Sequence, residues 1–172
     1  MPLVVFVIAA IVFRLVTVFI SVRNERRLKT GGAAEYGART SNALALAHIV
    51  FYLAAIAEAT VRGWPAFNAV SGVGLALYLF GAGMLIAVIR TLGRFWTVKL
   101  LIASDHVLVA NTLFRRVRHP NYYLNILPEL TGFALALHAY ATLLVGLPLY
   151  LIPLVLRIRQ EEAVMRARFA NY

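Results

Sequence analysis

The feature that most constrains this chain is a long apolar run at its start. From Pro2 to Val22 the only charged side chain is Arg14. A helix needs about 20 residues to cross a bilayer, so this run is long enough to span one. A cleavable signal peptide would begin with a basic segment and have a shorter apolar core. We therefore predict that this run is a retained membrane span.

The composition extends this conclusion to the whole chain. Of the 172 residues, 62% are hydrophobic and 14% are charged, and the mean hydropathy is +0.79. Soluble domains carry about 25% charged residues, so the solvent of this chain must be the bilayer. The chain has no cysteine, which excludes disulfides, cysteine nucleophiles and thiolate metal sites, and no metal is predicted.

Further apolar runs predict about five spans. The second and third are expected at residues 43–61 and 68–89, and the apolar stretch from Tyr122 to Leu156 is long enough for a helical hairpin that turns near His138. An amphipathic tail, Arg157–Tyr172, follows. The predicted fold is an all-α integral membrane protein whose last two spans form a hairpin.

The basic residues predict the orientation. The net charge is +10, which in a soluble protein would suggest nucleic acid. Here nearly all Lys and Arg follow the first, third and fifth predicted spans, and the other connections hold only Arg62. Cytoplasmic loops carry such an excess, and basic residues at span ends contact anionic lipids. We expect an N-terminus outside, a cytoplasmic active site, membrane lipids as partners and no nucleic acid.

One candidate site lies where the third connection meets the fourth predicted span. The string there is Arg118, His119, Pro120, Asn121, Tyr122. Proline suits the first turn of a helix, and arginine, histidine and free backbone N–H groups can bind an anion or a carboxylate. Arginine, histidine and tyrosine also anchor helix ends at membrane interfaces. The string alone is compatible with either role.

A second candidate is the glutamate pair Glu161 and Glu162, just after the last predicted span. Adjacent helical residues point about 100° apart, so we expect at most one of the two carboxylates to face the bundle. Taken alone, the pair is typical of an ordinary charged helix.

Together the two motifs resemble the hallmark of the isoprenylcysteine carboxyl methyltransferase family. The resemblance extends upstream to Arg90, Leu92, Gly93 and Trp96 and downstream to Phe169 and Tyr172, which is about half the chain. It implies residues 90–172 as the catalytic region and residues 1–89 as a three-span membrane region of the same domain. It also implies an S-adenosylmethionine cofactor bound at the cytoplasmic helix ends, and a lipid-like substrate that enters from the bilayer.

The site residues follow from the resemblance and from the intramembrane charges. The predicted cofactor-binding residues are His119, Tyr122, Asn125 and Glu161. The predicted catalytic residues are Arg118, Glu129 and Glu162, and the predicted substrate-binding residues are Arg90 and Trp96.

The chain departs from the family pattern at two places. The approach to the motif reads Asn111 to Phe114 where glycine and tyrosine are frequent, and Ala170 stands where glycine is usual. The N-terminal half, with Glu35, Tyr36 and Gly37, is more similar to the small bacterial branch, some members of which are associated with phenolic or pyrone lipids. The expected methyl acceptor is therefore a carboxylate or a hydroxyl of a lipid-like molecule.

Four ionisable residues lie inside predicted spans: Arg14, Glu58, Glu129 and His138. A charge at membrane depth costs several kcal/mol unless it is paired, so each is a functional candidate. Glu129 lies about two turns inside the fourth predicted span, which begins after His119. It could act as a base toward a hydroxyl acceptor, whereas a carboxylate acceptor needs no base. The alternative for Glu129 is a structural pair with Arg14 or another helix.

Two other functions remain open at this point. A membrane scaffold or lipid-binding protein would use the arginine string only as an anchor. An NADPH-dependent membrane reductase would need a nicotinamide cofactor in place of S-adenosylmethionine.

Overall fold

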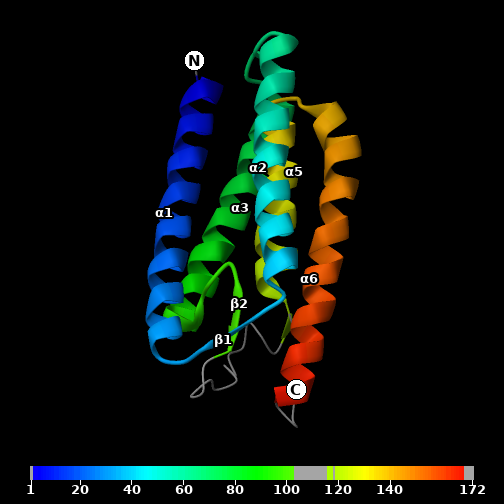
Figure 1. Ribbon diagram of the computed structural model, residues 1–172. Coiled ribbons are helices and arrows are strands. Elements are labelled where there is room, and N and C mark those ends of the chain that lie inside the picture. Colours follow the sequence, from blue (N-terminus) through cyan, green and yellow to red (C-terminus); the bar gives the residue numbers. More distant parts are fainter. Residues whose placement is uncertain (1, 103–115, 118, 169–172) are drawn as a thin grey trace.

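The computed structural model describes residues 2–102, 116–117 and 119–168, and its long helices stand side by side (Figure 1). These are α1 (Pro2–Thr30), α2 (Ala38–Val61), α3 (Ala69–Leu92) and α6 (Leu147–Arg168), with α5 (Leu127–Ala136) among them. The π-helical segment η2 (Asn121–Ile126) leads into α5, and a second one, η3 (Thr142–Gly146), leads into α6. The predicted all-α class and the terminal hairpin are confirmed.

Four helices within the described residues are long and apolar enough to cross a membrane: Pro2–Thr30, Ala38–Val61, Ala69–Phe95 and Thr142–Arg168. The protein is therefore an integral membrane protein. The fourth predicted span corresponds to the 6-residue η2 and the 10-residue α5, which are shorter and run antiparallel to α6 (Figure 1). The termini lie at opposite ends of the bundle, as an odd number of passes requires.

The helix ends differ from the sequence-based limits mainly where charged residues continue a helix. α1 runs on through the basic residues to Thr30, and α6 continues without a break through the predicted tail to Arg168. Lys29 pairs with Glu25 one turn earlier at 2.7 Å, and Arg166 pairs with Glu162 at 3.1 Å. Such i, i+4 pairs support a helix after its apolar face has ended.

A small β-ribbon, within the described residues, adds to the all-α expectation. β1 (Ala34–Tyr36) pairs antiparallel with β2 (Leu100–Ile102), in the register Ala34 to Ile102. It joins the connection after α1 to the segment after α3, at the same end of the bundle as the C-terminal part of α6 (Figure 1). Three-residue strands are too short to show a period-2 pattern, so they could not be predicted from hydropathy.

Glycines bring α3 and α5 into backbone contact. A Cβ on Gly74 would lie 2.3 Å from the amide nitrogen of Ala136, and one on Gly132 would lie 2.4 Å from that of Tyr78. The glycines of the third span were predicted to let another helix approach closely, and at Gly74 that helix is α5. Close approach of this kind is typical of helix packing in membranes, and it fixes the helix that carries His119 and Tyr122 at its start.

Polar contacts attach α1 to the segment after α3. The buried Asn24 side chain donates to the carbonyls of Gly93 at 3.1 Å and Trp96 at 2.9 Å. Ser21 accepts a hydrogen bond from the Val98 amide at 2.9 Å. These bonds hold the beginning of the predicted catalytic region against the first helix.

Candidate active site

His119 lies between the two glutamates of α6. Its side chain is buried, with Nε2 at 3.1 Å from Glu162 Oε1 and Nδ1 at 3.6 Å from Glu161 Oε1. Both carboxylates therefore reach the imidazole, contrary to the expectation that helix geometry lets only one face the bundle. Each glutamate side chain stays about a quarter exposed, at 27% and 28%, so a ligand can reach part of each side chain.

Electrostatics favour the protonated imidazole. Burial lowers the pKa of His119, but the hydrogen bond to Glu162 and the negative charges of both glutamates outweigh burial and hold that pKa above its usual range. Arg157 and Arg166 also pair with these two carboxylates, so their negative charges are balanced within the cluster. The carboxylate oxygens remain acceptors suited to hydroxyl and ammonium donors of a ligand.

Tyr122 ties the same helix start to α6. Its buried hydroxyl donates to Glu161 Oε2 at 2.6 Å and accepts from Arg157 Nε at 3.2 Å. Pro120 sets the first turn, and the amides of Tyr122 and Tyr123 both bond to the His119 carbonyl at 3.1 Å. The tight turn places His119 and Tyr122 on the side that faces α6.

Arg157 is a site residue that the sequence analysis missed. It is 3% exposed, and its Nη1 donates to Ser41 Oγ of α2 at 2.5 Å, while Nη2 donates to the Val98 carbonyl at 3.3 Å. It therefore joins Tyr122 to α2 and to the segment before β2. Its position four residues before Glu161 could have suggested an i, i+4 pair, but nothing in the sequence indicated Ser41.

Another close contact lies beside the cluster, at the start of α2. Gly37 has a φ of 59°, and a Cβ there would lie 2.4 Å from Gln160 Oε1. Within the described residues, Gln160 Oε1 and His119 Nδ1 are buried and make no hydrogen bond. Unsatisfied buried polar atoms are rare in folded proteins. One of these two belongs to a residue that contacts Glu161, and the other belongs to the residue before Glu161.

The structure describes three of four further predicted site residues. Arg118 lies outside the described residues, Arg90 is exposed in the last turn of α3, and Trp96 is buried against Leu85 and Val88. Asn125 is 1% exposed and faces Asn121 at 3.1 Å. Their predicted roles as cofactor or substrate contacts stay predictions.

Glu129 is not part of the His119 cluster. Its side chain is 0% exposed and accepts from Arg14 Nε at 2.5 Å and from the Tyr52 hydroxyl at 2.5 Å. The structure thus has the Arg14 pairing that the sequence left as an alternative, and this burial disfavours a role as a base toward substrate.

The remaining intramembrane candidates lie at the opposite end of the bundle. Glu58 accepts from the Ala141 and Thr142 amides at 3.0 and 2.8 Å. His138, at the hairpin turn, contacts Asn68 and Ser71 at 3.1 Å each. Both side chains hold the hairpin corner against the neighbouring helices.

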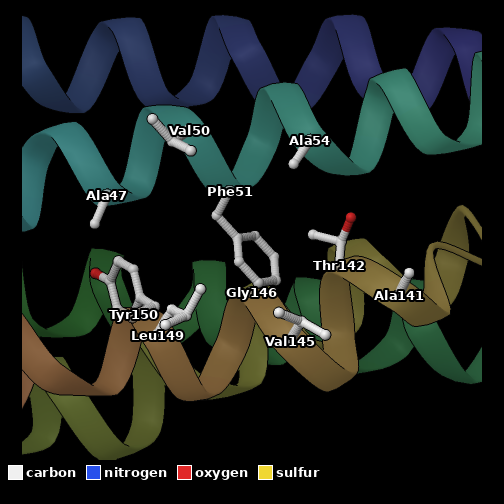
Figure 2. Close-up of a pocket in the computed structure, with 10 residues that line it drawn as sticks. All are labelled: Ala47, Val50, Phe51, Ala54, Ala141, Thr142, Val145, Gly146, Leu149 and Tyr150. Carbon is white, nitrogen blue, oxygen red and sulfur yellow. The ribbon is translucent and has the colours of Figure 1, made fainter.

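An apolar groove of about 390 Å³ separates α2 from the first turns of the α6 helix. Figure 2 shows the α2 residues Ala47, Phe51 and Ala54 on one side and Ala141, Gly146 and Tyr150 on the other. The groove lies between two candidate membrane spans and is lined mainly by apolar side chains.

Comparison with known proteins decides the family. The sequence profile of the isoprenylcysteine carboxyl methyltransferase (ICMT) family matches residues 74–167. The chain belongs to the ICMT family. The match begins in α3 and ends in α6, so it includes the β-ribbon partner β2, the His119 turn, the hairpin and both glutamates. Family membership makes a membrane methyltransferase the coarse functional assignment.

Two bacterial proteins cover nearly the whole length of this ICMT family member. A Haemophilus influenzae protein described as uncharacterized is 47% identical over 156 residues, covering 91% of this chain and 90% of that protein. The Bacillus subtilis protein YpbQ, also described as uncharacterized, is 26% identical over 161 residues, covering 91% and 92%. No solved structure matches the chain.

Proposed function

We propose that this protein is an S-adenosylmethionine-dependent methyltransferase that methylates a carboxylate or hydroxyl of a lipid-like substrate. The observation that carries the proposal is the convergence of Tyr122 and His119 on Glu161 and Glu162, residues 39 and 43 positions apart. Family membership independently indicates methyl transfer.

The chemistry of the cluster fits an adenosyl cofactor. Ribose hydroxyls and the amino-acid ammonium are hydrogen-bond donors, and the partly exposed oxygens of Glu161 and Glu162 can accept from them. His119 Nδ1 is one of the buried polar atoms that lack a hydrogen bond among the described residues. A ligand bound beside His119 would give this atom a partner.

In this proposal the protein acts mainly by holding two reactants in line. The cofactor supplies an electrophilic methyl group on a sulfonium. Glu161 holds its position because Tyr122 and Arg157 fix one oxygen, and His119 fixes Glu162. Orientation of this kind, in a site that excludes water, is the larger part of catalysis for a displacement that needs no metal.

The distribution of basic residues supports a cytoplasmic site. The ends of α1, α3 and α6 and the β-ribbon lie at one end of the bundle (Figure 1), and these segments hold nearly all described Lys and Arg. Under the positive-inside rule this end is cytoplasmic and the N-terminus is outside.

The groove of Figure 2 is our candidate for the apolar tail of the methyl acceptor. Tyr150 in the groove and Glu161 in the cluster are eleven residues apart on α6, about 16 Å along the helix. An acceptor whose head group is methylated near Glu161 would need a hydrocarbon chain of at least that length to reach the groove. The groove thus predicts a preference for long-chain acceptors.

The test is binding of S-adenosylhomocysteine, the product of methyl transfer, to the purified protein in detergent, measured by calorimetry. The proposal expects saturable binding that NADPH does not compete, together with transfer of a labelled methyl group to lipid extracts. A scaffold would bind neither nucleotide. A reductase would bind NADPH instead, and either result would refute the proposal.

A further inference from the structure

A second polar cluster lies deeper in the bundle, centred on the fully buried Glu129 of α5. Arg14 of α1 binds this carboxylate through both Nε and Nη2, and the Tyr52 hydroxyl of α2 donates to Oε1. His48 Nε2, also from α2, lies 3.7 Å from the same oxygen. The Glu129 carboxylate of α5 therefore bonds directly to side chains of two other helices, α1 and α2.

The same cluster reaches the remaining helices. Tyr150 of α6 contacts His48 Nδ1 at 3.4 Å. The acceptors around the Asn125 amide assign its nitrogen to the end that faces Glu129. In this orientation the amide donates to Glu129 Oε2 at 3.0 Å and to the Gly81 carbonyl of α3 at 3.2 Å. A Cβ on Gly81 would lie 2.8 Å from the Asn125 carbonyl, so α3 fits here only without a side chain.

The contacts of Glu129 limit what it can do. Its carboxylate has no exposed surface, and both oxygens are engaged by donors. A buried ion pair of this kind seldom adds much stability compared with an apolar pair, but it fixes one geometry because every alternative leaves a charge unpaired. The feature it can fix here is the rotation and depth of the η2–α5 helix.

That helix carries the proposed cofactor site at its start. Tyr122 and Glu129 are seven residues apart, about two helical turns, so the rotation that Glu129 fixes is also the rotation that aims Tyr122. Asn125 lies between them and joins Glu129 to the η2 segment, where it also faces Asn121. π-helical turns are frequent at functional sites, and this one is held at both ends.

We propose that the Arg14–Glu129 ion pair is a positioning device that holds the η2 segment so that Tyr122 and His119 meet Glu161 and Glu162. The inference rests on the proposed function, because it concerns the site at which S-adenosylmethionine would bind. It makes Glu129 a positioning residue that acts through Tyr122, and it gives α1 a role in the site although α1 precedes the region that matches the family.

The experiment compares Glu129→Gln and the double variant Arg14→Gln/Glu129→Gln with the parent. The single variant leaves Arg14 without its counter-charge and is the more disruptive, so the double variant carries the test if the single one fails to fold. The measurements are the thermal midpoint in detergent, the Kd for S-adenosylhomocysteine, and hydrogen–deuterium exchange at the amides of residues 121–126.

Glu58→Gln is the matched control. Glu58 is also a carboxylate that joins two helices inside the bundle, since it binds the Ala141 and Thr142 amides and the Thr142 hydroxyl at 2.8–3.0 Å, but it lies at the end away from the cofactor cluster. Loss of this cap should lower the thermal midpoint without changing the Kd.

We expect the double variant to keep a thermal midpoint close to that of the parent, to bind S-adenosylhomocysteine about 10-fold more weakly and to exchange faster in η2. Parent-like affinity and exchange in that variant would overturn the proposal, as would an equal loss of affinity in Glu58→Gln. Failure of the parent itself to bind would refute the proposed function, and the exchange data would still decide whether Glu129 positions η2.

Discussion

The Tyr122 hydroxyl donates a 2.6 Å hydrogen bond to Glu161 Oε2. This bond joins the first turn of the hairpin's inner helix to the last turns of its outer helix, and it keeps one oxygen of Glu161 in place while the other faces His119. A hydrogen bond to a charged group is worth about 1.5 to 3 kcal/mol.

Tyr122→Phe therefore tests the bond directly. The variant keeps the ring but removes the donor, so Glu161 should lose its orientation and S-adenosylhomocysteine should bind about 10-fold more weakly. Calorimetric titration measures this effect. Tyr123→Phe, at a half-exposed neighbouring tyrosine, is the control and should bind like the parent. Equal affinity in all three proteins would mean that Tyr122 only anchors the helix end.

The two glutamates should not be equivalent. Glu161 is held by Tyr122 and Arg157, whereas Glu162 contacts His119 and the exposed Arg166. We expect Glu161→Gln to weaken binding of S-adenosylhomocysteine by about 10 to 100-fold. Glu162→Gln should have a smaller effect on affinity and alter mainly stability. The same calorimetric titration compares the affinities of the two variants. A larger loss of affinity in Glu162→Gln than in Glu161→Gln would contradict this prediction.

His119 should make stability depend on pH. Its folded pKa is raised by Glu161 and Glu162, against the opposing effect of burial. Such a group contributes stability that is fully present below its unfolded pKa of about 6.5 and is lost as pH rises through the higher folded value. The thermal midpoint of the parent should therefore fall above about pH 6.5 relative to that of His119→Gln. Parallel curves for the two proteins would contradict the assignment.

The groove predicts a dependence on acceptor chain length. A side chain at Gly146 would point at Phe51, whose ring lies 3.4 Å from the Cβ position, so Gly146→Leu should fill the groove. KM for long-chain alkyl phenols or fatty acids should rise while KM for short-chain ones stays constant. Gly83→Leu is the matched control, because no side chain beyond its chain neighbours and no other segment of the described residues lies within 4 Å of a Cβ there. A uniform change across chain lengths would remove the groove from the substrate path.

Cysteine labelling tests the orientation, and the chain's lack of cysteine gives a clean background. Cysteines at Thr30 and Ala163, both exposed at the site end, should react with a membrane-impermeant reagent only from the cytoplasmic side. A cysteine at the exposed Ala66, in the α2–α3 connection, should react only from the other side. The opposite pattern would place the site outside.

The sequence was sufficient for the features that depend on local pattern. Hydropathy located the long helices, and the polar turn at His138 marked the hairpin corner. The two motifs brought His119, Tyr122, Glu161 and Glu162 into one predicted site, because the resemblance supplied the pairing that spacing alone could not.

Long-range contacts between single residues could not be predicted. Ser41 and Arg157, which share a hydrogen bond, are 116 residues apart in the sequence. Neither residue belongs to a sequence pattern that predicts contact with the other. The same holds for β1 with β2, whose strands are too short for periodicity. Glu129 was identified as a charge that needs a partner, with Arg14 or another helix as the alternatives to a role as a base, and the structure has the pair with Arg14.

The central claim is that the His119 and Glu161 cluster binds an adenosyl cofactor, and its most direct test is the affinity of the purified parent and of Glu161→Gln for S-adenosylhomocysteine by calorimetry. The account predicts saturable binding with one site per chain, weakened at least about 10-fold in the variant at an unchanged fold. Absence of binding to the folded parent, or equal binding by the variant, would contradict it.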